Sequence, residues 1–171
     1  MKRIIFFSLI ALAILSSCSN KNKTNPLYYS NDMESSNCWN DNNTLVVGIG
    51  HSGKVFSKVT PEIPYSFTFH RPLKDISSKR VRRVEYSCWV NLSSTTSQAN
   101  LVLAIDTTGK SLLWVGTPTK QFVTEPNKWV QIKARATIPA NINRENEVKI
   151  YLWDNGKDAV SVDDFEITFK D

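Results

Sequence analysis

From Leu27 onward the chain consists of short runs in which apolar and polar residues alternate, separated by clusters of Ser, Asn, Gly and Pro. No run keeps a helical period over three turns. Alternation at period two predicts strands whose successive side chains point to opposite sides. About nine such runs with turn residues between them are typical of an all-β sandwich of two antiparallel sheets. The expected strands are 45–49, 55–59, 65–70, 81–92, 100–105, 111–116, 129–138, 147–153 and 160–170.

The same alternation divides the side chains of each strand between two faces. One face is aliphatic in the long runs and is expected to form the core. The other face mixes cations with aromatic rings, and it contains Trp89, Tyr151 and Trp153. Near Asp163 and Asp164 the apolar phase slips from 160 and 162 to 165 and 167, which predicts a β-bulge.

The N-terminal 18 residues read MKRIIFFSLIALAILSSC. Two cations precede an apolar stretch at 4–15, which is shorter than the roughly 20 residues that span a bilayer but suits a signal peptide. The ending Leu15-Ser16-Ser17-Cys18 resembles the lipobox of bacterial lipoproteins, which implies cleavage before Cys18 and attachment of lipid, including palmitate-type acyl chains, to that residue. An ordinary signal peptide with an incidental cysteine is the alternative.

This resemblance divides the chain into a signal peptide at 1–17, a lipidated cysteine with a polar tether at 18–26, and a folded module at 27–171. It also implies a lipid-anchored protein of the cell envelope. Because Ser19 and not Asp follows the cysteine, the resemblance favours the outer membrane of a Gram-negative bacterium.

The formal charge of +5, from 21 Lys and Arg against 16 Asp and Glu, suggests a polyanion binder until the positions are considered. Four of the cations, Lys2, Arg3, Lys21 and Lys23, precede Leu27, so the folded module is almost neutral. A near-neutral envelope module lacks the electrostatic basis for binding nucleic acid. The one basic cluster, 79–83, is interpreted as the solvated start of a strand, with an anionic glycan or lipid headgroup as the alternative partner.

Several motifs, taken in order, are similar to those of one family. The family is that of the galactose-binding-like jelly-roll modules, particularly the carbohydrate-binding modules attached to xylanases and glucanases. The resemblance covers nearly all of 30–170 and implies a jelly-roll fold and non-catalytic binding of carbohydrate. The motifs are Asp32-Met33-Glu34, Trp39, Gly50-His51-Ser52-Gly53-Lys54, the strand 84–90 with Trp89, Asn127-Lys128-Trp129-Val130, and Val162-Asp163-Asp164-Phe165-Glu166-Ile167.

The resemblance also implies a structural calcium ion where the first strand meets the last. The matching positions are Glu34, the backbone of Gly53 and Lys54, and Asp163, with Asp32 as a further ligand. Calcium accepts such mixtures of carboxylate and carbonyl oxygens. A solvent-facing bulge without metal is the alternative.

Exposed aromatic rings can stack on the apolar faces of sugars while polar groups bind the hydroxyls. We therefore predict a glycan-binding platform, with a covering layer over these rings as the alternative; Trp39 and Trp129 are expected in the core. The platform residues are Trp89, Trp114, Tyr151, Trp153, Arg83 and Arg135.

Cys38 and Cys88 remain once Cys18 is lipidated, and the envelope permits a disulfide between them; two buried free thiols are the alternative. The chain has no Gly-x-Ser-x-Gly motif, neither His51 nor His70 has a convincing nucleophile neighbour, and His51 is interpreted as a structural residue of the Ser-Gly-Lys turn. We therefore expect no enzyme. Two functions remain: a glycan-binding module on a lipid anchor, or a structural accessory lipoprotein that binds a protein partner in the envelope.

Overall fold

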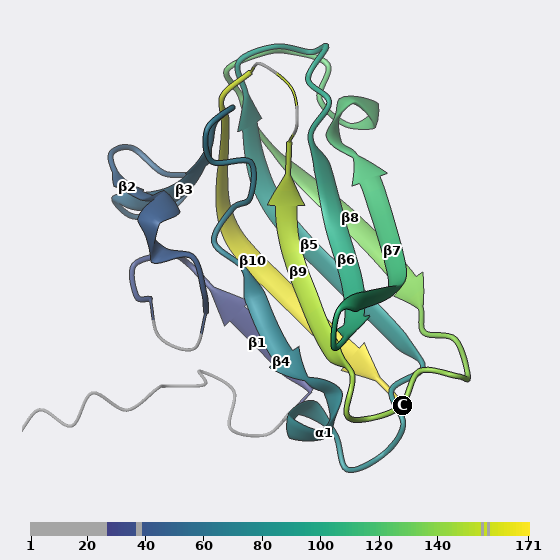
Figure 1. Cartoon of the computed structure of the whole chain (residues 1–171). Coiled ribbons are helices and arrows are strands. Elements are labelled where there is room, and N and C mark those ends of the chain that lie inside the picture. The colour runs from purple at the N-terminus through teal and green to yellow at the C-terminus, as the bar shows by residue number, and fades with distance from the viewer. Residues whose placement is uncertain (1–26, 37–38, 155, 157) are drawn as a thin grey trace, which may run out of the picture.

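The computed structural model describes residues 27–36, 39–154, 156 and 158–171, which form a sandwich of two antiparallel sheets (Figure 1). The six-stranded sheet has the order β2-β3-β10-β5-β8, with β1 also paired to β10. The four-stranded sheet has the order β4-β9-β6-β7. The expected all-β jelly-roll sandwich is confirmed, with ten strands in the described part of the chain.

The strands of the six-stranded sheet are β1 (Tyr28–Asn31), β2 (Leu45–Val47), β3 (Val55–Val59), β5 (Arg83–Leu92), β8 (Trp129–Thr137) and β10 (Val160–Lys170). Those of the four-stranded sheet are β4 (Phe69–Pro72), β6 (Asn100–Thr107), β7 (Lys110–Pro118) and β9 (Glu147–Trp153). The short helices are η1 (Asn42–Thr44), α1 (Leu73–Ile76) and η2 (Thr119–Gln121). The alternation pattern does not predict strand β1.

The last strand, β10, organises the six-stranded sheet because it pairs with β1, β3 and β5. Its register against β5 shifts between Asp163 and Glu166, and Asp164 has a φ of 48°. The β-bulge predicted from the phase slip is therefore confirmed. It changes the direction of the Asp163 and Asp164 side chains relative to a regular strand.

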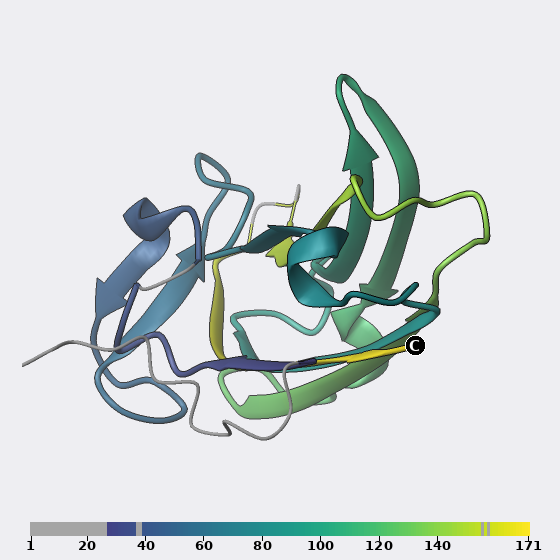
Figure 2. The ribbon, with the colours of Figure 1, turned by 90° about the horizontal axis from the view of Figure 1, so that it is seen from below.

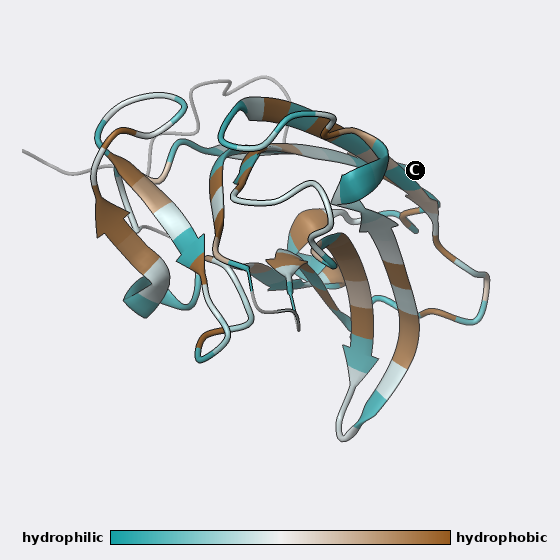
Figure 3. Cartoon of the chain, turned by 90° about the horizontal axis from the view of Figure 1, so that it is seen from above, coloured by the Kyte–Doolittle hydropathy of each residue, from teal (hydrophilic) through white to brown (hydrophobic). Residues whose placement is uncertain are grey.

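The core lies between the two sheets, as Figures 2 and 3 show for the layers and for the alternating apolar bands along the strands. Trp39 occupies one end of it and is buried, as expected. Its ring stacks on Phe67 with centroids 5.6 Å apart and also contacts Phe69 and Phe165. Trp39 and these three phenylalanines supply much of the apolar area that drives folding at this end.

Trp129 does not join the core, contrary to the expectation. It stands opposite Asn91 on the outer side of the six-stranded sheet and is only partly buried. Its ring makes edge contacts with Phe56 and His51, at centroid distances of 6.3 and 6.0 Å. Its neighbour Val130 packs against the core instead, as alternation requires for adjacent residues.

Candidate functional site

The outer face of the four-stranded sheet carries a group of aromatic side chains, here called the aromatic face: Tyr65, Trp114, Tyr151 and Trp153. Tyr65 forms a bridge to Trp153, and Tyr65 and Tyr151 meet edge-on with centroids 5.5 Å apart. Trp114 and Trp153 meet edge-on at 6.0 Å. Trp114 is 50% exposed and Tyr65 is 49% exposed, so two of the four rings are half accessible to a ligand.

Small residues beneath these rings make the face possible. Val102 and Ala104 of β6 lie opposite Tyr151 and Lys149 of β9 and, on the other side, opposite Gly116 and Trp114 of β7. A Cβ atom at Gly116 would lie 2.3 Å from the Trp114 ring, so glycine is needed for the indole to lie across the strand. The face thus has small side chains as its floor and aromatic rings above them.

Charged side chains continue this face along β9, because Trp153, Tyr151, Lys149 and Glu147 occupy alternate positions of one strand. Lys149 pairs with Asp106 at 3.1 Å, and Glu147 bonds to the Nε2 atom of His70. The row of four side chains spans about 20 Å at the usual rise per strand residue.

An open pocket of about 580 Å³ lies at the charged end of this row. It is lined by Asp106, Thr107, Thr108, Gly109, Lys110, Ser111, Glu145, Glu147 and Lys149. Each of its three acidic side chains bonds to a cation or to His70, since Glu145 pairs with Lys74 at 2.6 Å. The charges are therefore largely balanced, and the pocket offers many hydrogen-bonding groups without a strong field of one sign.

Tyr151 keeps its phenol proton across the neutral range. Burial raises the pKa of this hydroxyl above its usual value, and the nearby Tyr65 and Asp106 add to the rise, although a hydrogen bond with Trp114 opposes it. A neutral phenol both donates and accepts hydrogen bonds. The aromatic face therefore carries one polar group suited to a sugar hydroxyl.

The six residues of the predicted platform are divided between the two sides of the sandwich. Trp114, Tyr151 and Trp153 lie together on the outer face of the four-stranded sheet. Trp89, Arg83 and Arg135 lie on the outer face of the six-stranded sheet, on the opposite side of the molecule. The prediction that all six residues form one platform is therefore wrong. Alternation shows which side chains point away from the core, but not to which sheet a strand belongs.

The three residues on the six-stranded sheet have local partners there. The ring of His51 stacks on Trp89 with centroids 3.7 Å apart and an interplanar angle of 13°, which covers the indole. Arg83 pairs with Glu85 at 3.3 Å, and Arg135 stands opposite Glu85 in the ladder. The His51 ring thus covers one face of the Trp89 indole, and the side chain is partly buried.

Tyr65 belongs to the aromatic face, although the sequence pattern does not single it out as a site residue. The pattern predicts a strand at 65–70, whereas the structure starts β4 at Phe69 and leaves Tyr65 as an isolated bridge to Trp153. The preceding Pro64 is the available signal, because its carbonyl accepts the N–H of Asp154 and sets Tyr65 beside β9.

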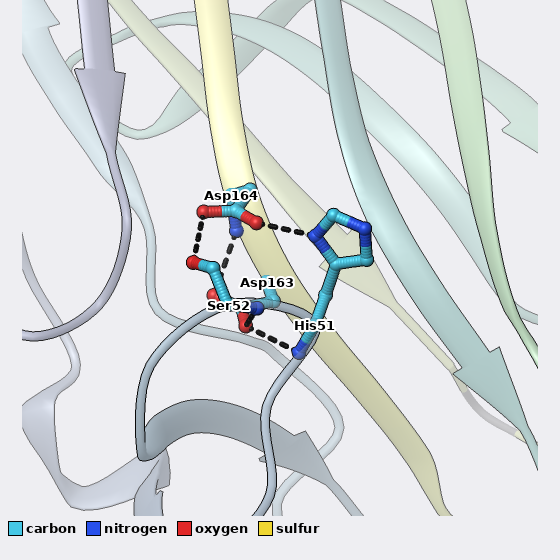
Figure 4. A network of polar contacts seen from close by, with 4 residues as sticks. All are labelled: His51, Ser52, Asp163 and Asp164. Carbon is cyan, nitrogen blue, oxygen red and sulfur yellow. Dashed lines mark hydrogen bonds and ion pairs between the residues drawn. The ribbon is translucent and has the colours of Figure 1, made fainter.

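A second polar group surrounds the bulge of β10 (Figure 4). The Asp164 carboxylate lies 2.6 Å from Nδ1 of His51 and accepts a hydrogen bond from the Ser52 hydroxyl at 2.8 Å. The Asp163 carboxylate accepts the backbone N–H groups of His51 and Ser52 at 2.8 and 3.1 Å. Ser52 donates to Asp164 and not to His51, so this geometry does not activate a serine nucleophile.

The loop at 48–54 is held from its other side by Glu34. One Glu34 oxygen accepts the N–H groups of Lys54 and Val55 at 2.6 and 2.8 Å. Together with the two bonds to Asp163, this makes four backbone N–H groups in and beside the loop that are bonded to two carboxylates. The loop therefore has a fixed conformation on the outer side of the six-stranded sheet.

The predicted calcium ligands lie around this loop, but they contact protein groups. Asp163 uses both oxygens for backbone N–H groups, the Lys54 carbonyl accepts the N–H of Gly48 at 2.8 Å, and Asp32 accepts the N–H of Glu34 at 3.3 Å. Among the described residues no three or more His, Cys, Asp or Glu side chains are grouped as metal ligands. Hydrogen bonds thus account for these carboxylates without a cation, and calcium stays a prediction.

Replacing Gly53 by alanine should destabilise the fold more than the same change at Gly109. Both glycines have positive φ, 60° and 71°, which costs an alanine about 1 kcal/mol. Only at Gly53 would the new Cβ also lie 2.2 Å from the Glu34 carboxylate, whereas nothing lies within 4 Å at Gly109. Urea unfolding should show Gly53→Ala less stable than Gly109→Ala by about 1–3 kcal/mol. Equal losses would show that the Glu34 contact contributes nothing.

Asp163 should make folding stability fall as the pH rises from about 4 to about 6. Burial raises the pKa of this carboxyl from 3.8 to about 6, more than the N–H groups of Ser52, Asp164 and His51 lower it. The folded state then binds the proton more tightly than the unfolded state, so the contribution is greatest at low pH and is lost as the pH passes the folded pKa. Urea unfolding in EDTA should show that the free energy of unfolding of the wild type falls relative to that of Asp163→Asn between about pH 4 and about pH 6. A difference independent of pH would contradict this assignment.

Cys88 is buried and forms no disulfide with another residue that the structure describes, and burial raises the pKa of its thiol. Cys38, its proposed disulfide partner, lies outside the described residues, as do Cys18 and the signal peptide. The pairing of Cys38 with Cys88 therefore stays a prediction.

The fold matches that of known carbohydrate-binding modules. The CBM22-2 xylan-binding domain of Paenibacillus barcinonensis Xyn10C aligns with a TM-score of 0.58 and 19% identity over 83% of this chain and 99% of that domain. The CBM22-1 xylan-binding domain of the same protein aligns with a TM-score of 0.52 and 17% identity over 84% of this chain and 93% of that domain. At these identities the likeness shows the jelly-roll fold alone.

Neither a known family profile nor a curated protein sequence matches the chain. The fold and the site together define a jelly-roll module with the architecture of carbohydrate-binding modules and an aromatic outer face on its four-stranded sheet.

Proposed function

We propose that this protein is a non-catalytic glycan-binding module whose ligand lies on the aromatic face. The observation that carries the proposal is the gathering of Tyr65, Trp114, Tyr151 and Trp153 on one outer face of a sheet, two of them half exposed. A soluble sandwich normally covers such rings or replaces them by polar residues on its solvated faces.

The face offers the two kinds of contact that a sugar needs. The rings of Trp114 and Trp153 provide flat apolar surfaces for the C–H faces of pyranose rings. Asn100, Lys149 and Asp106, which flank them on β6 and β9, provide donors and acceptors for hydroxyl groups. The balanced charges of the neighbouring pocket favour a neutral glycan over a polyanionic one.

The similar domains of known structure are named as xylan-binding, which makes xylan the first ligand to test. Affinity electrophoresis of the purified protein in gels containing xylan, mixed-linkage glucan, laminarin or galactan should show retardation by at least one neutral polysaccharide. Bovine serum albumin is the control for non-specific retardation. No retardation in any gel, together with co-purification of a stable envelope protein, would support the accessory-subunit function in its place.

We further propose that the module is displayed on a lipid attached to Cys18, at the outer membrane. This proposal rests on the signal-peptide pattern and the lipobox resemblance of residues 1–18. Within the described part of the chain no helix has the length and apolar character needed to cross a bilayer. The intact mass of the protein isolated from membranes should equal that of a chain beginning at Cys18 plus its acyl groups.

The calcium prediction is that Ca²⁺ raises the thermal midpoint of EDTA-treated protein, because an ion that binds only the folded state stabilises it. Glu34→Gln should abolish the rise, since it removes a predicted ligand charge. Mg²⁺ is the matched control ion. An unchanged midpoint in millimolar Ca²⁺ would leave the hydrogen bonds to the loop as the role of these carboxylates.

A further inference from the structure

The connection between β2 and β3 exposes two apolar side chains on the side of the molecule opposite the aromatic face. Val47 is 81% exposed and Ile49 is 92% exposed, the highest values among the large hydrophobic side chains of the described residues. Single exposed apolar residues are common, but two that lie together at one turn of the chain form a contact point. In Figure 2 this loop lies on the outer side of the six-stranded sheet.

The loop is fixed, so its apolar side chains stay directed to the outside. Gly48 donates its N–H to the Lys54 carbonyl at 2.8 Å, and His51 is bonded to Asp163 and stacked on Trp89. Ile49 lies between these two fixed points. The backbone on both sides of Ile49 is therefore held in place while its side chain is exposed.

Cations surround the loop on the same side. Lys54 in the loop, Lys58 on β3 and Lys133 on β8 are exposed, and none of the three forms an ion pair with another residue that the structure describes. Of the acidic groups on this face, Glu85 pairs with Arg83 and Lys170. Glu34, Asp164 and Glu166 are bonded to backbone N–H groups, to His51 and to Tyr28, so the face carries charges of both signs. Exposed lysines beside exposed apolar side chains are groups through which a protein contacts membrane surfaces that contain anionic lipids.

The tether joins the module in the same sheet. Strand β1 belongs to the six-stranded sheet, and the Leu27 carbonyl, directly before it, accepts the N–H of Phe169. Cys18 precedes Leu27 by nine residues, which reach about 30 Å when fully extended. That reach is shorter than β10, whose 11 residues span about 37 Å at the usual rise. A lipid on Cys18 therefore keeps Leu27 within about 30 Å of the bilayer, a distance shorter than the length of strand β10.

We propose that the module lies on the membrane with its 48–54 loop inserted, Val47 and Ile49 entering the boundary between headgroups and acyl chains. Lys54, Lys58 and Lys133 then face anionic headgroups. This proposal rests on the lipid anchor proposed above. It orients the aromatic face away from the membrane, because that face is on the opposite side of the sandwich.

The test uses the lipidated full chain in vesicles of phosphatidylethanolamine and phosphatidylglycerol. A nitroxide is attached at Ile49→Cys in a Cys38→Ser background, where the remaining Cys88 is buried. The matched control is Thr108→Cys, an exposed position at the tip of the β6–β7 hairpin on the other side. Collision with a water-soluble nickel complex should fall about fivefold or more at position 49 on vesicle binding, with little change at 108.

The outcomes separate this inference from the proposals on which it rests. Equal nickel accessibility at 49 and 108 in lipidated, vesicle-bound protein would overturn the inserted loop while leaving the anchor intact. A chain without lipid by intact mass would overturn the anchor and the inserted loop together. A fall in nickel accessibility at position 49 in vesicles that contain phosphatidylglycerol, but not in vesicles of phosphatidylcholine, would support the role of the lysines. An unchanged far-UV circular dichroism spectrum and thermal midpoint check that both labelled variants are folded.

Discussion

Trp153→Ala should weaken glycan binding about 30-fold or more while leaving the fold intact. The Trp153 ring contacts the Trp114 ring, so its loss removes one stacking surface and the aromatic neighbour of another. Truncating a central aromatic residue of a binding site costs about 2 kcal/mol or more, which is about a 30-fold loss of affinity. Isothermal titration calorimetry with the polysaccharide that retards the wild type measures this loss of affinity.

The control for this experiment is Trp89→Phe, which changes an aromatic residue on the opposite side of the sandwich. It should bind glycan as the wild type does, because Trp89 is covered by His51 and is remote from the aromatic face. Equal loss of affinity in both variants would show that binding depends on general stability. Loss in Trp89→Phe alone would place the ligand on the six-stranded sheet and would refute the aromatic face as the site.

Phe67→Ala should lower the free energy of unfolding by about 3–5 kcal/mol, more than Gly53→Ala does. Phe67 is fully buried, stacks on Trp39, and donates its N–H to the Ser57 hydroxyl at 2.9 Å. Truncation leaves a cavity at the end of the core that the stiff neighbouring rings cannot fill. Urea unfolding followed by far-UV circular dichroism measures the change in stability.

Phe122→Ala is the matched control, since the same side chain is removed from a position where it is 38% exposed. It should change stability by about 1 kcal/mol or less, as most surface substitutions do. Similar losses at the two positions would mean that the aromatic cluster around Trp39 does not contribute to folding as its burial implies.

The fold and the bulge could be predicted from the sequence because both depend on local alternation. The slip of apolar phase at Asp163 and Asp164 is visible in the sequence and appears as the register shift of β10. Trp39 could also be placed in the core, because tryptophan is highly buried on average. Strand β1 could not be predicted, because its four residues, YYSN, show little alternation and gain their pairing only from β10.

The site could be predicted only in part. Alternation correctly predicted that Tyr151 and Trp153 point away from the core. The pairing of β6 with β9 and with β7 depends on long-range contacts that alternation does not show. The same rule correctly predicted that Trp89 points outward, but it did not show that Trp89 belongs to the other sheet, where the His51 ring stacks on it. Tyr65 could not be recognised as a site residue, because its place on the aromatic face depends on a bridge to Trp153.

The central position of β10 has a consequence for how the chain folds. This strand is the last to be made, yet it lies between β5 on one side and both β1 and β3 on the other, and it pairs Tyr28 with Thr168. Until residues 160–170 leave the ribosome or emerge from a translocation channel, β1 and β3 have no central strand to join. Such dependence on pairings distant in sequence slows folding. The growing chain should therefore stay protease-sensitive until residues 160–170 are free to pair with β1, β3 and β5.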